Sequence, residues 1–195
     1  MSGLDLFGDV STVDTGERSD HDFYETPGFM TRSLLHFHPS IRGSKVLESC
    51  SGRDAIVTIL RVAGCDVYTN DIDPRHPAET HEDATLASYW SGAPCVDWVI
   101  SNLPFEPAFG ILPHALAHAD VGVAMLLRKT FTEPTLERGP WLAKNPPTRT
   151  IGLPRWPFRG AGTDSVPCDW FIWERRPDRS LQPIVIDHAA ERRTR

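Results

Sequence analysis

The chain has 195 residues, of which 40% are hydrophobic and 24% charged, with a net charge of −6. This composition is typical of a soluble single domain with a substantial core, and no apolar run approaches the roughly 20 residues of a membrane span. The four cysteines form no Cys-x-x-Cys pair and the chain starts without a signal pattern, so we expect reduced thiols and a cytoplasmic location.

Helix and strand patterns alternate along the chain. Apolar residues recur at helical spacing in some stretches, while short apolar runs elsewhere are typical of buried strands. Such alternation favours a mostly parallel sheet with helices on both faces. Helices are predicted at residues 26–39, at 55–63, and after the strand at 97–101 as far as residue 116. Asp54 is a candidate cap of the second helix. Strands are predicted at 45–50, 66–70, 97–101, 121–127, 148–153 and 170–173.

Charge is distributed unevenly. Residues 1–27 carry seven acidic side chains and one basic one, whereas residues 121–160 carry seven basic and two acidic ones. The basic half suits an anionic polymer bound on one face, although a mixed solvated surface explains the same pattern. We expect residues 1–22 to be a mobile acidic arm, 23–178 the folded domain and 179–195 a tail.

Acidic residues follow the first two predicted strands. Glu48 ends the first, shortly before Gly52, whose missing side chain lets the backbone approach a ligand closely. Asp71 ends the second, where a carboxylate is the expected partner of ribose hydroxyls. Because the glycine pattern is not Gly-x-Gly-x-x-Gly and Glu48 would repel a phosphate, we expect a nucleoside cofactor without phosphates. Alternatively, Asp71 and Asp73 cap a surface loop before Pro74.

A tetrapeptide follows the strand predicted at 97–101. It consists of Asn102, Leu103, Pro104 and Phe105. Ligands of open α/β sheets bind at this end of the strands. The Asn102 amide oxygen can accept a hydrogen bond from an amino group, and the Phe105 ring can stack on a planar group. Taken alone, the same residues also make an ordinary strand-ending turn.

Together these motifs resemble the S-adenosylmethionine-dependent methyltransferases, and more narrowly those that modify N6 of adenine in DNA. The resemblance rests on Glu-x-x-x-Gly at 48–52, Asn-Asp-Ile-Asp at 70–73, and Asn-Leu-Pro-Phe at 102–105, a variant of the family's Asn-Pro-Pro-Phe motif. Residues 23–27 resemble the family's N-terminal cofactor segment, and 162–173 its closing hairpin. The resemblance implies a Rossmann-like, seven-stranded, mostly parallel sheet with helices on both faces and a C-terminal antiparallel hairpin.

The resemblance also implies how S-adenosylmethionine would bind. Glu48 would hold the amine of its methionine part, and Asp71 its ribose hydroxyls. Asp83, following a third strand, would accept from its adenine, although a plain acidic turn explains Asp83 as well. The expected cofactor-binding residues are Thr26, Pro27, Glu48, Cys50, Gly52, Asp71, Ile72 and Asp83.

By the same resemblance, an adenine extruded from its stack would lie on Phe105. The Asn102 side-chain oxygen and the Leu103 carbonyl would accept from its amino group, with Pro104 fixing the turn. Two residues depart from the family pattern. Leu103 replaces a proline, which frees its φ angle, and Asp54 stands where the family often has glycine.

Basic and aromatic residues of the second half are candidate nucleic-acid contacts, although Trp156 is equally explained as a packing residue. No metal site is expected, because His114 and His118 lack an evident third ligand. The candidate contacts are Arg128, Lys129, Arg155, Trp156 and Arg159.

The length leaves no room for a separate target-recognition domain, so we expect recognition through loops within 128–165, with short or relaxed specificity. This small form resembles methyltransferases carried by phages and mobile elements. DNA is the favoured substrate. RNA, and more remotely a protein glutamine, are alternatives, as is a non-catalytic cofactor-binding subunit that needs a partner. A homodimer is also open.

Overall fold

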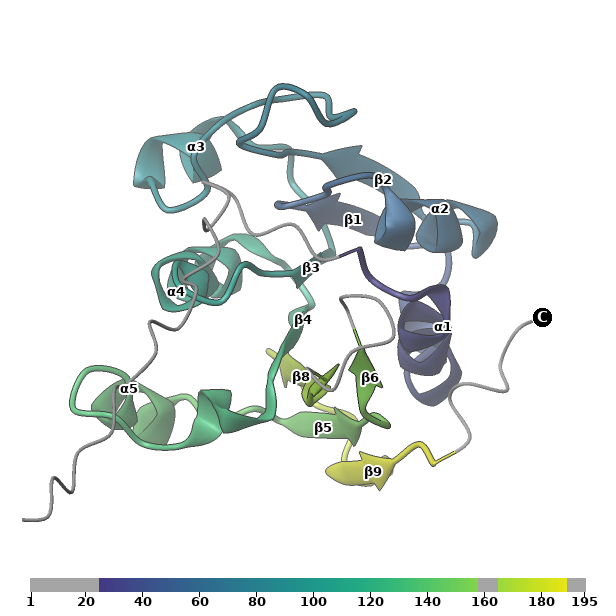
Figure 1. The fold of residues 1–195 in the computed structure, drawn as a ribbon, viewed down its shortest axis with the longest axis vertical. Helices are drawn as coiled ribbons and strands as arrows, with labels where there is room; N and C mark the ends of the chain where they lie inside the picture. Colours follow the sequence, from purple (N-terminus) through teal and green to yellow (C-terminus); the bar gives the residue numbers. More distant parts are fainter. Residues whose placement is uncertain (1–24, 158–164, 189–195) are drawn as a thin grey trace, which may run out of the picture.

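A computed structural model describes residues 25–157 and 165–188 of the protein. Its main feature is a seven-stranded sheet in the order β2-β1-β3-β4-β8-β5-β9 (Figure 1). The strands are β1 (Lys45–Glu48), β2 (Asp66–Thr69), β3 (Trp98–Asn102), β4 (Gly122–Arg128), β5 (Arg149–Gly152), β8 (Cys168–Glu174) and β9 (Ile184–Ile186). A separate pair joins β6 (Trp156–Pro157) to β7 (Ser165–Val166).

The sheet is mostly parallel, as predicted. Strand β8 alone runs against its neighbours, because it pairs antiparallel with β4 and β5 while the other pairs in this sheet are parallel. Parallel strands need crossover connections, which helices supply here. The helices are α1 (Gly28–Phe37), α2 (Ala55–Val62), α3 (Ala87–Gly92), α4 (Ala108–His118) and α5 (Gly139–Lys144), with 3-10 turns η1 (Pro39–Ile41) and η2 (Lys129–Thr132).

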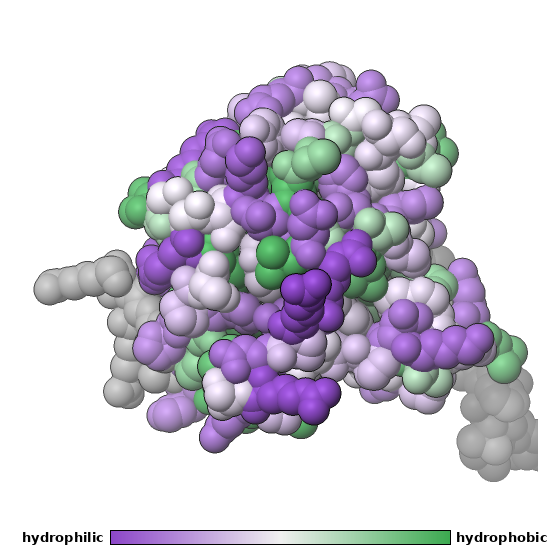
Figure 2. Space-filling model, turned by 180° about the vertical axis from the view of Figure 1, so that it is seen from behind, coloured by the Kyte–Doolittle hydropathy of each residue, from purple (hydrophilic) through white to green (hydrophobic). Residues whose placement is uncertain are grey.

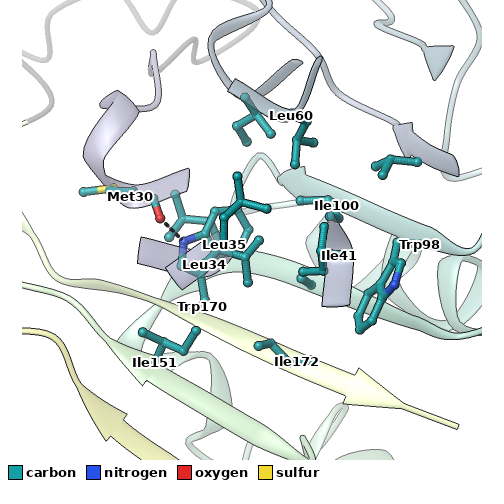
Figure 3. Packing of buried hydrophobic residues seen from close by; sticks show 14 of the residues in the cluster. Met30, Leu34, Leu35, Ile41, Leu60, Trp98, Ile100, Ile151, Trp170 and Ile172 are labelled. Carbon is teal, nitrogen blue, oxygen red and sulfur yellow. Dashed lines mark hydrogen bonds between the residues drawn. The ribbon is translucent and has the colours of Figure 1, made fainter. Parts of the chain in front are cut away.

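Helices cover both faces of the sheet, with α1 and α2 on one side and α3, α4 and α5 on the other (Figure 1). Successive side chains of a strand point to opposite faces, so β4 supplies Ala124 and Leu126 to the first core and Val123 and Met125 to the second. Burial on both faces explains why β4 is a continuous apolar run. In the first core the indole Nε1 of Trp170 donates to the carbonyl of Met30, 2.8 Å away (Figure 3).

The strand predicted before Asp83 does not form. Between β2 and α3 the described chain makes only an isolated bridge, from Asn70 to Thr80. Pro74 and Pro77 lie in this segment, and proline cannot donate to a strand ladder. Consequently β2 is one edge of the sheet, and the seventh strand is β9, at the opposite edge.

The closing antiparallel pair also differs from the prediction. The hairpin partner of β8 is β5, whereas Ser165 pairs with Pro157 in the small sheet, and residues 162–164 lie outside the described ranges. Strand β9 falls within the stretch 179–195 that was predicted as a tail, so this stretch contributes an edge strand. Residues 1–22, the predicted arm, also lie outside the described ranges.

The prediction that the Asp54 side chain caps α2 is wrong. Its backbone has a φ of 62° and its side chain makes no capping hydrogen bond, whereas a capping residue adopts an extended backbone.

Within residues 25–157 and 165–188, no helix combines the length and apolarity needed to cross a bilayer. On the face drawn in Figure 2, hydrophobic residues lie in small groups among hydrophilic ones.

Candidate active site

The carboxyl ends of the first four strands open onto one cavity of about 860 Å³. The chain passes from β1 outward to β2 and then crosses back to β3 on the other side of β1. The connections therefore diverge between β1 and β3, which is the switch point at which open α/β sheets bind ligands. The volume falls within the roughly 300–1,000 Å³ typical of small-molecule sites.

Most of the predicted site residues meet at this cavity. Glu48, Pro27, Lys129, Arg155 and Trp156 do not line it, and Arg159 lies outside the described residues. The predicted residues in its wall are Thr26, Cys50, Gly52, Asp71, Ile72, Asp83, Asn102, Leu103, Pro104, Phe105 and Arg128.

The loop after β1 forms one wall of the cavity. Gly52 has a φ of 55°, and its backbone N–H donates to Asp71 Oδ2 at 2.8 Å. Ser49 and Ser51 also line the wall. Their hydroxyl oxygens are buried and have no hydrogen-bond partner in the described part of the chain. Buried polar atoms are rarely left unpaired, so these hydroxyls are suited to a polar ligand.

Asp71 is held firmly at the end of β2. Besides the Gly52 contact, its Oδ1 accepts from the backbone N–H of Asp73 at 2.9 Å and lies 3.1 Å from Nδ1 of His76. The side chain is buried but reaches the cavity. The predicted ribose-binding carboxylate therefore also fixes the loop after β1.

Glu48 lies beneath the cavity rather than in its wall. It is fully buried, accepts a hydrogen bond from Ser101 Oγ, and lies 3.4 Å from the backbone nitrogen of Cys50. Burial raises the pKa of Glu48 well above its ordinary value. Burial also raises the pKa of the Cys50 thiol, assisted by Glu48 and Asp71, so Cys50 is not an activated nucleophile.

Asn70 supports the cavity wall without lining it, a role that sequence reasoning missed. Its side chain is completely buried and makes four hydrogen bonds. The amide nitrogen donates to the carbonyls of Ser49 and Glu82, each at 3.0 Å, and the oxygen accepts from Thr80 Oγ1 and the Glu82 N–H. Asn70 thereby joins the loop after β1 to the segment that carries Asp83. Its place in Asn-Asp-Ile-Asp was a signal, but its partners come from separate segments.

The tetrapeptide after β3 is anchored on both sides. The Asn102 amide nitrogen donates to Thr26 Oγ1 at 3.0 Å, which links the N-terminal segment to the turn. The Leu103 side chain is 1% exposed and packs in the second core. The leucine at this position therefore fills the core and fixes the turn through packing.

The residues predicted to contact a nucleic acid lie in different parts of the structure and make different contacts. The Arg128 guanidinium carbon lies 3.9 Å from the centroid of the Phe105 ring. Lys129 instead points to Asp169, with 3.5 Å between Nζ and Oδ2. Trp156 packs edge-on against Phe29 at 5.1 Å, which supports the packing alternative. Arg155 is exposed.

No metal site is found among the described residues. His114 stacks on Trp90, and His118 lies edge-on to the same ring, with its Nε2 2.8 Å from the Pro94 carbonyl oxygen. These contacts account for the histidine pair without a metal.

No protein-family model matches the chain, and no curated protein sequence does. Solved structures do share its fold. A type I restriction-modification methyltransferase subunit from Streptococcus thermophilus is similar with a TM-score of 0.62 at 14% identity, over 87% of this chain and 52% of that one. The chain has the class I methyltransferase fold.

In two further structures with this methyltransferase fold, the match to this chain extends over more of the other protein's length. A candidate RNA methyltransferase from Pyrococcus horikoshii has a TM-score of 0.61 at 18% identity, over 78% of this chain and 87% of that one. Magnesium protoporphyrin IX methyltransferase from Synechocystis, with bound S-adenosylmethionine, has a TM-score of 0.55 at 16% identity, over 76% and 79%. By contrast, this chain spans about half the length of the Streptococcus thermophilus subunit.

Proposed function

We propose that this protein transfers a methyl group from S-adenosylmethionine to the N6 amino group of adenine in DNA. The observation that carries the proposal is the placement of the Asn102–Phe105 turn. It shares one cavity with the loop after β1 and with Asp71, at the switch point of a class I methyltransferase fold.

The cavity wall suits S-adenosylmethionine. The unpaired hydroxyls of Ser49 and Ser51 can bind its methionine part, and the Asp71 carboxylate its ribose. Asp83 accepts hydrogen bonds from the N–H and hydroxyl of Thr85, at 2.9 and 2.7 Å, and these lower the pKa of Asp83 and keep it an ionised acceptor. Ile72 is 51% exposed and lines the cavity, where it can pack on an adenine ring. Bound there, S-adenosylmethionine would supply an electrophilic methyl group.

The turn after β3 would orient the acceptor. Because the Asn102 nitrogen donates to Thr26, the amide oxygen is the branch that accepts from an amino group. With the Leu103 carbonyl it would hold the N6 hydrogens and direct the nitrogen lone pair at the methyl group. The Phe105 ring would take the extruded base. The protein's contribution is then positioning and electrostatic complementarity.

DNA is supported by the order of the sequence motifs and agrees with the restriction-modification role named for the Streptococcus thermophilus subunit. RNA is the second candidate, because the Pyrococcus horikoshii structure is matched over 87% of its own length. Arg128, the last residue of β4, lines the cavity and would contact either polymer.

The test is methyl transfer from labelled cofactor to unmethylated DNA and, in parallel, to total RNA, with the products resolved as nucleosides. We expect N6-methyladenine from DNA. Asn102→Ala should lower the transfer rate at least ~100-fold with cofactor affinity retained. Asn145→Ala is the matched control, because Asn145 caps α5 away from the cavity.

Three outcomes would overturn the proposal or part of it. Full methylation by Asn102→Ala would remove the turn from the catalytic site. Label only in RNA would change the substrate class. Cofactor binding without transfer to either polymer would favour a protein substrate or a subunit that needs a partner.

A further inference from the structure

Arg128 and Phe105 form a stacked pair inside the cavity. Asn102 of β3 pairs with Leu126 of β4, so Arg128, two residues further along β4, emerges beside the turn that carries Phe105. Both side chains line the cavity, and the guanidinium carbon lies 3.9 Å from the ring centroid. A planar cation thus lies where a planar acceptor would stack.

This placement makes the guanidinium a competitor of the acceptor. The Phe105 ring also packs against the first core, which fixes its position. A neutral planar molecule can reach the covered ring face only by displacing Arg128 without offering it a new partner. A base on a phosphate backbone brings an anion, and guanidinium–phosphate pairs are bidentate and stronger than an exposed cation–π contact.

The neighbouring cation shows that the arrangement is specific to position 128. Lys129 carries the same charge, but it is directed to the buried carboxylate of Asp169 and does not line the cavity. Arg128 is the last residue of β4, whereas Lys129 begins the 3-10 turn η2, and only Arg128 of this pair lines the cavity with Phe105.

We infer that Arg128 is a specificity-determining residue, which makes the acceptor site select a base carried on a phosphate backbone over a free nucleoside or a neutral amide side chain. The inference rests on the proposed function and names its substrate class. Arg128 covers the Phe105 ring until a backbone phosphate binds the guanidinium, and the ring then takes the base.

The first experiment measures binding of a free nucleoside, 2-aminopurine riboside, by its fluorescence. Loss of the competing guanidinium in Arg128→Ala should tighten this binding about two- to five-fold, the range set by an exposed cation–π contact. Lys129→Ala, the matched control, should bind the nucleoside as the wild type does. Equal affinity in Arg128→Ala and wild type would overturn the inference.

The second experiment compares a single-stranded oligonucleotide that contains 2-aminopurine with the same oligonucleotide made with neutral methylphosphonate linkages. Wild type and Lys129→Ala should both prefer the phosphate form. In Arg128→Ala the preference should shrink about ten-fold, because one charged hydrogen-bonded contact is lost. An unchanged preference would refute the role of Arg128.

Both experiments measure binding, so they separate this inference from the proposed methylation. If the wild type methylates adenine while Arg128→Ala behaves as wild type in both assays, only the inference fails. If Arg128→Ala behaves as expected while the wild type transfers no methyl group to adenine, only the proposed activity fails.

Discussion

Asp54 occupies a backbone conformation that suits glycine. Its φ of 62° and ψ of 23° place it in the left-handed region, directly before α2 and within the loop after β1. One carboxylate oxygen, Oδ1, is buried without a hydrogen-bond partner in the described part of the chain. Because this backbone conformation favours glycine, we predict that Asp54→Gly stabilises the fold.

The expected gain follows from three opposing contributions. Relief of the left-handed strain gives ~1 kcal/mol, the lower end of the range because aspartate tolerates this region. Removal of the unpaired oxygen gives about 1 kcal/mol for a partly buried residue. The greater backbone entropy of glycine in the unfolded chain costs roughly 0.5–1 kcal/mol. The net gain is about 1 kcal/mol, which raises Tm by roughly 2–4 °C for a chain of this length.

Thermal unfolding followed by calorimetry is the assay, and Gly64→Ala is the matched control. Gly64 has a φ of 85°, and a Cβ added there meets nothing within 4 Å, so this substitution isolates the backbone penalty. It should lower stability by about 1 kcal/mol. A lower Tm for Asp54→Gly would refute the reasoning, because the aspartate would then contribute more than its conformation costs.

Three further substitutions test the site. Asp71→Ala should leave the chain folded but weaken S-adenosylmethionine binding measured by calorimetric titration, and unchanged affinity would remove Asp71 from the site. Glu48→Gln should stabilise the cofactor-free protein. Burial raises the pKa of Glu48 in the folded protein. As the pH rises above the ordinary pKa of a glutamate, the unfolded chain loses this proton first, so the wild-type protein becomes less stable. The Tm gain of Glu48→Gln should therefore be absent near pH 4 and grow toward pH 8. Asn70→Asp sets a carboxylate oxygen against the carbonyls of Ser49 and Glu82, so a loss of about 3 kcal/mol is expected in denaturant unfolding. Wild-type stability would contradict the role of Asn70.

The central strands and the cavity residues at their carboxyl ends could be predicted from the sequence, because they depend on local patterns. Strands β3 and β4 are buried on both faces, so each contains an apolar run, at 98–100 in β3 and at 122–127 in β4. Asn102 is the last residue of β3 and Phe105 lies three residues further on, while Asp71 follows β2 after one residue. Because parallel strands place their carboxyl ends on the same side of the sheet, these residues meet at one cavity.

Contacts between distant segments could not be predicted. Asn70 joins segments 21 and 12 residues away, and nothing in its immediate neighbours reveals that its amide is buried. The Arg128–Phe105 stack depends on the register of β4 against β3. The strand before Asp83 was expected from the resemblance to methyltransferases, although the prolines at 74 and 77 argued against it.

The C-terminal strands connect to the turn at Asn102 through α1, although none of them carries a predicted catalytic residue. Trp170 of β8 donates to the Met30 carbonyl, and the Ser33 hydroxyl donates to Asp187, just after β9, at 2.7 Å. These two contacts hold α1 against the sheet, and Thr26 lies two residues before that helix.

Thr26 in turn fixes the Asn102 amide. A chain of buried contacts therefore leads from the edge strand β9 to the turn that would bind the acceptor. The strand is distant from the cavity in sequence, but the Ser33–Asp187 contact connects its end to α1, and the segment that enters α1 holds the Asn102 amide through Thr26.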